Sequence, residues 1–345
     1  MREVGDGCWA FMQPDGSWGR NNAGLISDGE ASLLVDTLFD MRLTERMLAT
    51  MRAAVPAAKR IGTVVNTHAN GDHCWGNALV RDAEIIASRR GAAEMAEIPP
   101  ALMAKLSKVA RTSMRMGKLG AGLGRLAGKL GIEVLASVIE AAPFVLEIFG
   151  DFDFDGIELV LPSKTFDHQL TVNVGSKTVE LIEVGPAHTK GDVIVHVPGD
   201  RVVYTGDILF IGGHPVVWEG PFSNWIAACE RIEAMDVDAI VPGHGPLTDK
   251  AGVRKLREYL EYVQSEARKR YDAGMGAFEA AQDIAVTGLS SRRSAANFAD
   301  WSEAERMVVN VDTLYREFSG AGPRKSVVPC FAAMARFSGK SLQSL

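Results

Sequence analysis

Short apolar runs separated by turn-forming residues characterise the first 90 residues of the chain. The runs at 8–13, 24–26 and 33–36 are predicted to be extended strands. Residues 43–54 instead place apolar side chains at helical spacing, which predicts an amphipathic helix. Strands and a helix therefore alternate in this first segment.

The same alternation returns at residues 157–250. Turn residues at Asn173-Val-Gly and Pro198-Gly-Asp separate further apolar runs, which are predicted to be strands. A helical pattern around Trp225 and Ile232 precedes an apolar run at 239–241. Together, the two segments favour a sandwich of two β-sheets covered by helices.

Residues 92–150 interrupt this pattern and are rich in helix-forming residues. The stretch 101–131 carries seven basic residues and no acidic one, whereas 132–158 carries seven acidic residues and no basic one. We favour two helical arms of opposite charge that pair with each other. The alternative is a lid over a cleft, with Leu102, Leu106, Val109 and Met114 as its apolar face.

Residues 251–345 are mostly helical in pattern. The stretch 254–271 places Leu256, Tyr259, Leu260 and Val263 on one side, and 301–318 reads as a second amphipathic helix that begins at Ser302-Glu-Ala-Glu. No chemistry is visible in this extension. It is predicted to pack against the sandwich or against a second copy in a homodimer.

Charge and composition narrow the functional classes. The 345 residues carry a formal net charge of −6, so the chain lacks the overall positive charge that is typical of nucleic-acid-binding proteins. The first residues lack the pattern of a secretory signal and no apolar run is long enough for stable membrane insertion, so a cytoplasmic protein is expected. The four cysteines, Cys8, Cys74, Cys229 and Cys330, are scattered, which favours reduced thiols.

Candidate metal ligands cluster directly after one predicted strand. The β-branched run that starts at Ile61 ends at His68-Ala-Asn70-Gly-Asp72-His73. Imidazole and carboxylate groups are the usual non-sulfur ligands of zinc, and open α/β sheets bind ligands at the carboxyl ends of their strands. This loop is therefore a candidate metal-binding loop.

The same residue types recur at three later strand ends. His188, Asp207 and His244 each follow an apolar run and are flanked by Gly or Pro. A catalytic metal ion needs ligands that converge from separate loops, with one position left for water. The four segments together predict such a site.

Together with the early runs Ala23-Gly-Leu-Ile and Leu34-Val-Asp-Thr, these four segments resemble in their order the metallo-β-lactamase superfamily, whose motif is His-x-His-x-Asp-His followed by a distant His, an Asp and a final His. The resemblance covers residues 1–250 and implies an α/β fold, the four-layer αβ/βα sandwich, with a helical insertion at about 92–150 and a helical extension at 251–345. It implies one metal site at His68, residue 70 and His188, and a second at Asp72, His73 and His244, with Asp207 bridging. Asn70 stands where the motif has its second His, and an amide is a weaker donor than imidazole, so the first site is predicted to bind zinc less tightly.

Two chemistries remain open, and hydrolysis is favoured. One or two Zn²⁺ ions would activate water against an ester, thioester, lactone or related bond, with Asp72 orienting that water. Alternatively, His68, His188 and Asp207 would hold Fe²⁺ in a mononuclear oxygenase that resembles the persulfide dioxygenases of the same superfamily. A non-catalytic binding module is the third possibility, although it leaves the retained ligands unexplained.

Three further residues are candidates for substrate binding: His214, Trp75 and Trp218. His214 lies seven residues after Asp207 and could donate a hydrogen bond to a developing oxyanion. The tryptophans could line an apolar pocket. The expected partner is a small molecule, anionic or partly apolar.

Overall fold

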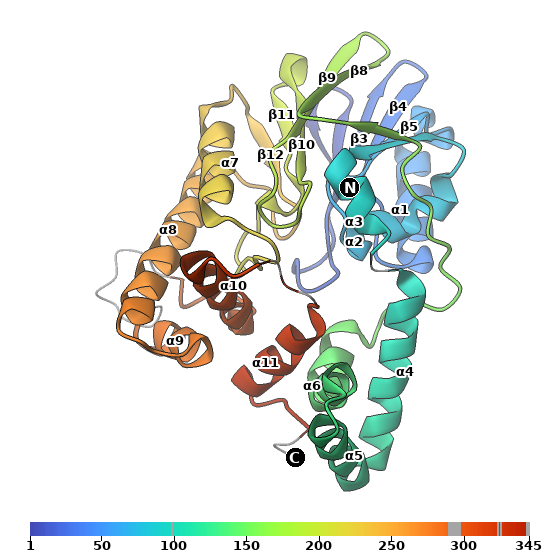
Figure 1. The fold of residues 1–345 in the computed structure, drawn as a ribbon. Helices are drawn as coiled ribbons and strands as arrows, with labels where there is room; N and C mark the ends of the chain where they lie inside the picture. The colour runs from blue at the N-terminus through green and yellow to red at the C-terminus, as the bar shows by residue number, and fades with distance from the viewer. Residues whose placement is uncertain (98, 289–297, 323, 325, 343–345) are drawn as a thin grey trace.

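Two β-sheets pack face to face in the computed structural model, which describes residues 1–97, 99–288, 298–322, 324 and 326–342 (Figure 1). The order in the first sheet is β1 (Arg2–Gly5), β2 (Cys8–Phe11), β3 (Ala23–Asp28), β4 (Ala31–Val35), β5 (Thr63–Val65), β6 (Glu84–Ser88) and β7 (Lys164–Phe166). The order in the second is β12 (Ala239–Val241), β11 (Val202–Tyr204), β10 (Val193–Val197), β9 (Lys177–Glu183) and β8 (Gln169–Val174).

The alternating direction of side chains along each strand produces the layers of the sandwich. In β4, Leu33 and Val35 lie in the core between the sheets, whereas Leu34 faces the helices on the other side. In β10, Val193 belongs to the core between the sheets and Ile194 to the helix-facing core. Successive side chains of a strand point to opposite faces, so each sheet contributes to two apolar cores. The predicted αβ/βα sandwich is confirmed.

Helices cover both outer faces of the sandwich. The helices outside the insertion are α1 (Met41–Ala54), α2 (Gly71–Cys74), α3 (Arg89–Met95), α7 (Phe222–Ala234), α8 (Lys250–Asp272), α9 (Ala277–Asp283), α10 (Met307–Ser319) and α11 (Val328–Phe337). Short 3-10 turns occur at Pro56–Lys59, Trp75–Val80, Pro198–Asp200, Gly206–Ile208 and Ala304–Arg306, and a π-turn at Ile284–Gly288. Helix α1 begins at Asp40, whose side chain accepts a hydrogen bond from the Leu43 amide (2.7 Å).

The insertion forms the helices α4 (Pro100–Met116), α5 (Lys118–Lys129) and α6 (Glu133–Phe149), which lie together with α11 below the sheets in Figure 1. Helix α6 packs against α4, α5 and α11. The helical character of the insertion was predicted correctly, but the predicted pairing of its basic arm with its acidic arm was mostly wrong. Lys108 does reach Asp155 (2.8 Å), whereas Glu140 and Glu147 of α6 pair with Arg336 and Lys340 near the C-terminus.

The C-terminal extension packs against the sandwich. Leu256, Tyr259, Leu260 and Val263 of α8 are all buried in one core with Trp225 of α7, as the helical spacing predicted. Helix α10, however, begins at Met307 instead of near Ser302. The backbone of Ser302 is engaged elsewhere: its amide donates to the Gly212 carbonyl and its carbonyl accepts from the His214 amide.

Two further expectations concern the cysteines and the membrane. All four cysteines are buried free thiols, as predicted. Among the described residues, no helix combines the length and the apolar character needed to cross a bilayer.

Candidate metal centre

The metal-ligand candidates gather at one edge of the sandwich because the strands that precede them run in the same direction. Strands β4 and β5 are parallel, and so are β11 and β12. Strand β9 also runs with β11, since β10 is antiparallel to both. The loops after β5, β9, β11 and β12 therefore leave the sheets at the same edge and carry His68 to His73, His188, Asp207 and His244.

The side chains form two groups that share a centre. His68, His188 and Asp207 make one group, and Asp72, His73 and His244 the other; within each, the potential ligand atoms lie within 4.8 Å of one another. All six side chains are buried. Sequence analysis thus placed these six residues together correctly.

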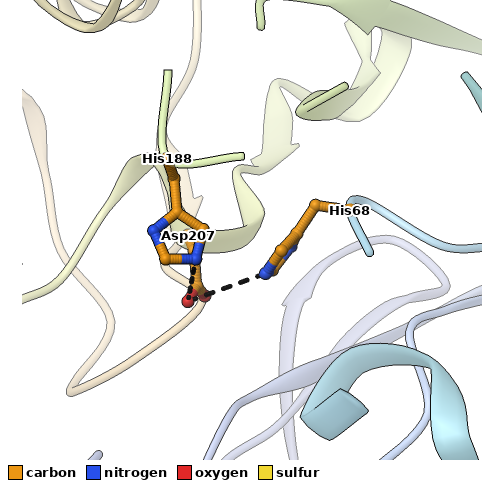
Figure 2. Close-up of side chains that lie close together, drawn as sticks. All are labelled: His68, His188 and Asp207. Atoms are coloured by element: carbon orange, nitrogen blue, oxygen red, sulfur yellow. Dashed lines mark ion pairs between the residues drawn. The ribbon is translucent and has the colours of Figure 1, made fainter. Parts of the chain in front are cut away.

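Asp207 lies between the two groups. Figure 2 shows the imidazoles of His68 and His188 directed toward its carboxylate, with Nε2–Oδ2 distances of 3.8 and 3.4 Å. From the second group, His73 Nε2 lies 3.0 Å from Oδ1 and His244 Nε2 lies 3.4 Å from Oδ2. This central position suits the bridging role that the sequence predicts for Asp207.

Each of the four histidines is held through Nδ1, the ring nitrogen that does not face the cluster. In every case Nδ1 lies against an oxygen that can accept its proton, which directs Nε2 to the cluster. The partners are Thr67 Oγ1 for His68 (3.0 Å), Asp36 Oδ2 for His73 (2.8 Å), the Val216 carbonyl for His188 (2.7 Å) and the Gly16 carbonyl for His244 (3.0 Å).

Asp36 is the functional residue that sequence reasoning missed. It follows β4, is buried, and accepts hydrogen bonds from the Thr67 amide (2.7 Å) and the Thr67 hydroxyl (2.8 Å) as well as lying against His73. Because Thr67 in turn contacts His68, one carboxylate orients two histidines. The signal was present: Asp36 ends an apolar run in the same way as the ligand candidates.

The buried polar atoms of the cluster fit a metal ion. In the described part of the chain, His68 Nε2 has no hydrogen-bond partner, and His73 Nε2 and Asp207 Oδ1, although 3.0 Å apart, do not form a hydrogen bond with each other or with another group. A buried polar group without a partner costs about 1–3 kcal/mol, and native proteins rarely leave several together without a role. Imidazole nitrogen and carboxylate oxygen are ligands for zinc and for other divalent transition metals. The donor set therefore fits one or two such ions.

Charge in the cluster also favours a cation. Burial by itself lowers the pKa of His73, but the carboxylates of Asp207, Asp36 and Asp72 outweigh it and hold that pKa well above its usual value. Burial disfavours charge on Asp207 as well, yet the neighbouring imidazoles, His244 foremost, hold the pKa of Asp207 well below its usual range. Buried carboxylates that remain ionised attract a cation, and metal binding would displace protons from the imidazoles.

Comparison with known families identifies the fold. The sequence profile of the metallo-beta-lactamase superfamily matches residues 16–244. The chain belongs to the metallo-beta-lactamase superfamily. The resemblance inferred from the sequence is thereby confirmed.

Known relatives match this chain over short segments. The 2,4-dinitroanisole O-demethylase subunit alpha of Nocardioides sp. (strain JS1661) is 32% identical over 77 residues, which is 22% of this chain and 24% of the relative. The hydroxyacylglutathione hydrolase of Fuscovulum blasticum is 30% identical over 83 residues, 23% of this chain and 32% of the relative. The matches thus span a quarter to a third of these relatives.

Solved structures with a similar fold cover more of the chain. The stereoselective inverting sec-alkylsulfatase Pisa1 from Pseudomonas sp. superimposes on 92% of this chain and 50% of its own, with a TM-score of 0.61 and 14% identity. A metallo-beta-lactamase from Pontibacter korlensis covers 75% of this chain and 97% of its own, with a TM-score of 0.51 and 15% identity. At this level of sequence identity, the similarities establish the fold alone. The names among the relatives agree with the prediction of a metallo-β-lactamase-fold hydrolase.

Asn70 marks the departure from the superfamily motif. Its Nδ2 lies 2.9 Å from His188 Nε2, and the side chain lines the cavity over the cluster. The amide is therefore adjacent to the first group of candidate ligands. Its role as a weak ligand stays a prediction.

Replacing Asn70→His should strengthen metal binding at the first group, because imidazole is a better zinc donor than an amide. We expect the metal dissociation constant of that site to fall by on the order of tenfold or more, since even outer contacts to a ligand change metal affinity by about 10- to 100-fold. Competition with a chromophoric chelator measures it. Asn173→His, on an exposed stretch of β8, is the control. Unchanged affinity and stoichiometry in Asn70→His would contradict this placement.

A cavity opens over the cluster, and aromatic rings form much of its wall. Trp75 and Trp218 line it, and their role in substrate binding stays a prediction. The sequence did not single out the other rings, which come from distant parts of the chain: Trp18, Phe39, Phe149, Phe210 and Phe331. Within this wall, Phe39 stacks on Trp75 (5.2 Å between centroids) and Trp18 lies 6.2 Å from Trp218.

His214 does not take the predicted substrate-binding position. It is buried with Nδ1 2.9 Å from the Tyr259 hydroxyl, and it is absent from the described residues that line the cavity. Burial and the nearby Arg306 lower the pKa of His214 to about 3. Pairing of its backbone with Ser302 turns the loop toward α8, which the sequence of the loop alone does not reveal. Arg306 lines the cavity instead, with its guanidinium 4.1 Å from the centre of the Trp18 ring.

Proposed function

We propose that this protein is a metal-dependent hydrolase that acts on an ester, thioester, lactone or related bond of a small molecule. The observation that carries the proposal is the convergence of four imidazoles and two carboxylates on one centre, with buried donor atoms that no protein group satisfies in the described part of the chain. The superfamily to which the chain belongs supports it.

Bound zinc would lower the pKa of a coordinated water toward neutrality and so provide a hydroxide nucleophile. His68, His188 and Asp207 would hold one ion, and Asp72, His73 and His244 the other, with Asp207 in contact with both. The Nδ1 contacts direct every Nε2 toward the cluster, and a metal at the first group would replace the contact between Asn70 Nδ2 and His188 Nε2. The six candidate ligands would thus bind the ions, and the Nδ1 partners would orient the histidines among them.

Asp72 is the carboxylate best placed to handle a proton. Its side chain is 12% exposed, against 3% for Asp207, and it lines the cavity. Its Oδ2 also lies 3.4 Å from His244 Nε2, so the group contacts both the cluster and the space for substrate. We therefore assign Asp72 the role of orienting the attacking water and accepting its proton.

An iron oxygenase is the second candidate. His68, His188 and Asp207 form by themselves the two-His, one-carboxylate set of non-haem ferrous enzymes. That set would leave Asp72, His73 and His244 without a ligand role, although they lie equally close together. The second group therefore favours hydrolysis.

Metal analysis of protein purified without added metal separates these candidates. We expect one or two equivalents of zinc, and hydrolysis that chelation removes and zinc restores. One equivalent of iron with oxygen consumption would support the oxygenase instead. Retained metal with no turnover of any substrate would support a binding module.

The substrate panel follows from the proposed bond classes and from the names of the relatives. It contains esters, thioesters and lactones, together with a secondary alkyl sulfate and 2,4-dinitroanisole. Each compound is tested with the zinc-loaded, the iron-loaded and the metal-free protein. Turnover of any member by the zinc-loaded protein alone supports the proposal.

A further inference from the structure

A second cavity adjoins the space over the metal cluster. It lies among α4, α6 and α11, the helices below the sheets in Figure 1. We call it the outer chamber. Its apolar walls consist of Leu102, Met103, Leu106, Val138, Ala141, Val145, Phe149, Trp218, Val327, Val328 and Phe331.

The outer chamber adjoins the metal cavity through shared walls. Six residues line both spaces: Glu94, Met103, Phe149, Trp218, Val327 and Phe331. The outer chamber has a volume of about 340 Å³, against about 160 Å³ over the metal cluster. The outer chamber is therefore the larger of the two adjoining spaces that a ligand could occupy.

Both basic side chains that line the outer chamber already have partners. Lys190 pairs with Glu97 (2.7 Å), and Arg324 pairs with Asp312 (2.6 Å) and donates to the Trp218 carbonyl (2.9 Å). The amide of Lys190 also donates to Glu94 (2.9 Å). A charged ligand group would have to compete with these contacts, whereas an apolar group gains from burial against the aliphatic and aromatic walls.

We propose that the outer chamber binds an extended apolar tail of the substrate while the scissile bond lies over the metal cluster. The substrate class is then an amphiphilic small molecule with a medium or long acyl or alkyl chain. This inference rests on the proposed function, because it specifies the substrate of that same site. The helical insertion supplies α4 and α6, so this segment determines which tails the enzyme accepts.

Binding of n-alkyl carboxylates from butyrate to dodecanoate tests the inference without requiring turnover. Isothermal titration of the metal-loaded protein should show affinity that rises about fourfold per added methylene over the intermediate lengths and then levels off, as expected for methylenes that leave water until the chamber is full. Affinity that does not rise with chain length overturns the inference. Failure of hydrolysis in the substrate panel would instead overturn the proposed function.

Two substitutions on different helices fill the outer chamber. Val145→Trp on α6 and Leu106→Trp on α4 should each weaken decanoate binding at least tenfold and leave butyrate binding within twofold. Leu119→Trp on α5, where the side chain is 70% exposed, is the matched control and should leave the whole series unchanged. Because two independent positions are used, misfolding of one variant leaves the other informative. A chain-length dependence that neither substitution alters places the tail elsewhere and overturns the inference.

Discussion

The Asp207→Asn variant should lose hydrolytic activity by on the order of 10³-fold or more, because hydroxide supply at neutral pH depends on the metal ions that this residue helps to hold. Asp207 has close contacts with members of both ligand groups. Its carboxylate oxygens lie 3.0 to 3.8 Å from Nε2 of His73, His188, His244 and His68.

The substitution removes charge and nearly conserves shape. The carboxylate is 3% exposed, so water does not compensate for the lost charge. An amide offers a weaker donor to both metal sites and places an N–H group against imidazoles that must present lone pairs. Both sites should therefore weaken together, whereas loss of a residue from one group alone should affect one site first.

Metal stoichiometry and activity of the purified variant check this expectation. His214→Gln is the matched control, since His214 is a buried histidine that contacts Tyr259 and not the cluster. It should retain the metal content of the unmodified protein. Full metal content and activity in Asp207→Asn would show that the two groups do not share this carboxylate as a ligand.

Local patterns predicted the ligand set because each ligand sits where a strand ends. Apolar runs located the strands, and Gly or Pro beside His188, Asp207 and His244 located the loops. Parallel strands then bring such loops to one edge, so spacing along the chain did not have to be known. The same reasoning gave the core face of α8, since Leu256, Leu260 and Val263 repeat at helical spacing.

Features that depend on contacts between distant segments were not predictable in this way. The cavity wall joins Trp18, Phe149 and Phe331, which are separated by well over one hundred residues each. The acidic helix α6 was expected to pair with basic neighbours, but apolar packing against α11 positions it, with Phe144 and Met334 in the same core. Burial of apolar area outweighs exposed ion pairs, whose contributions are about 0–1 kcal/mol.

The contacts of Asp36 at the candidate metal centre were not predictable for the same reason, because they join segments that are distant in the sequence. Its carboxylate accepts from the Thr67 amide and hydroxyl and lies 2.8 Å from His73 Nδ1. The φ angle of Asp36 is 62°, a left-handed conformation that Asn also adopts readily. Asp36→Asn therefore tests the carboxylate with little change to the backbone.

We expect Asp36→Asn to lower metal affinity and activity by about 10- to 100-fold, the usual effect of removing an outer partner of a metal-binding histidine. The amide cannot accept from His73 and from both Thr67 donors at once, so His73 loses the contact that fixes its tautomer. Chelator competition and steady-state kinetics measure the loss, and denaturation of the metal-free protein shows whether stability changes with it. Asp40→Asn is the control: the side chain of this buried aspartate accepts from the Leu43 and Asp153 amides and lies 3.6 Å from Arg42, away from the histidines, and asparagine caps a helix equally well. Equal metal affinity in both variants would mean that orientation of His73 does not depend on the Asp36 carboxylate.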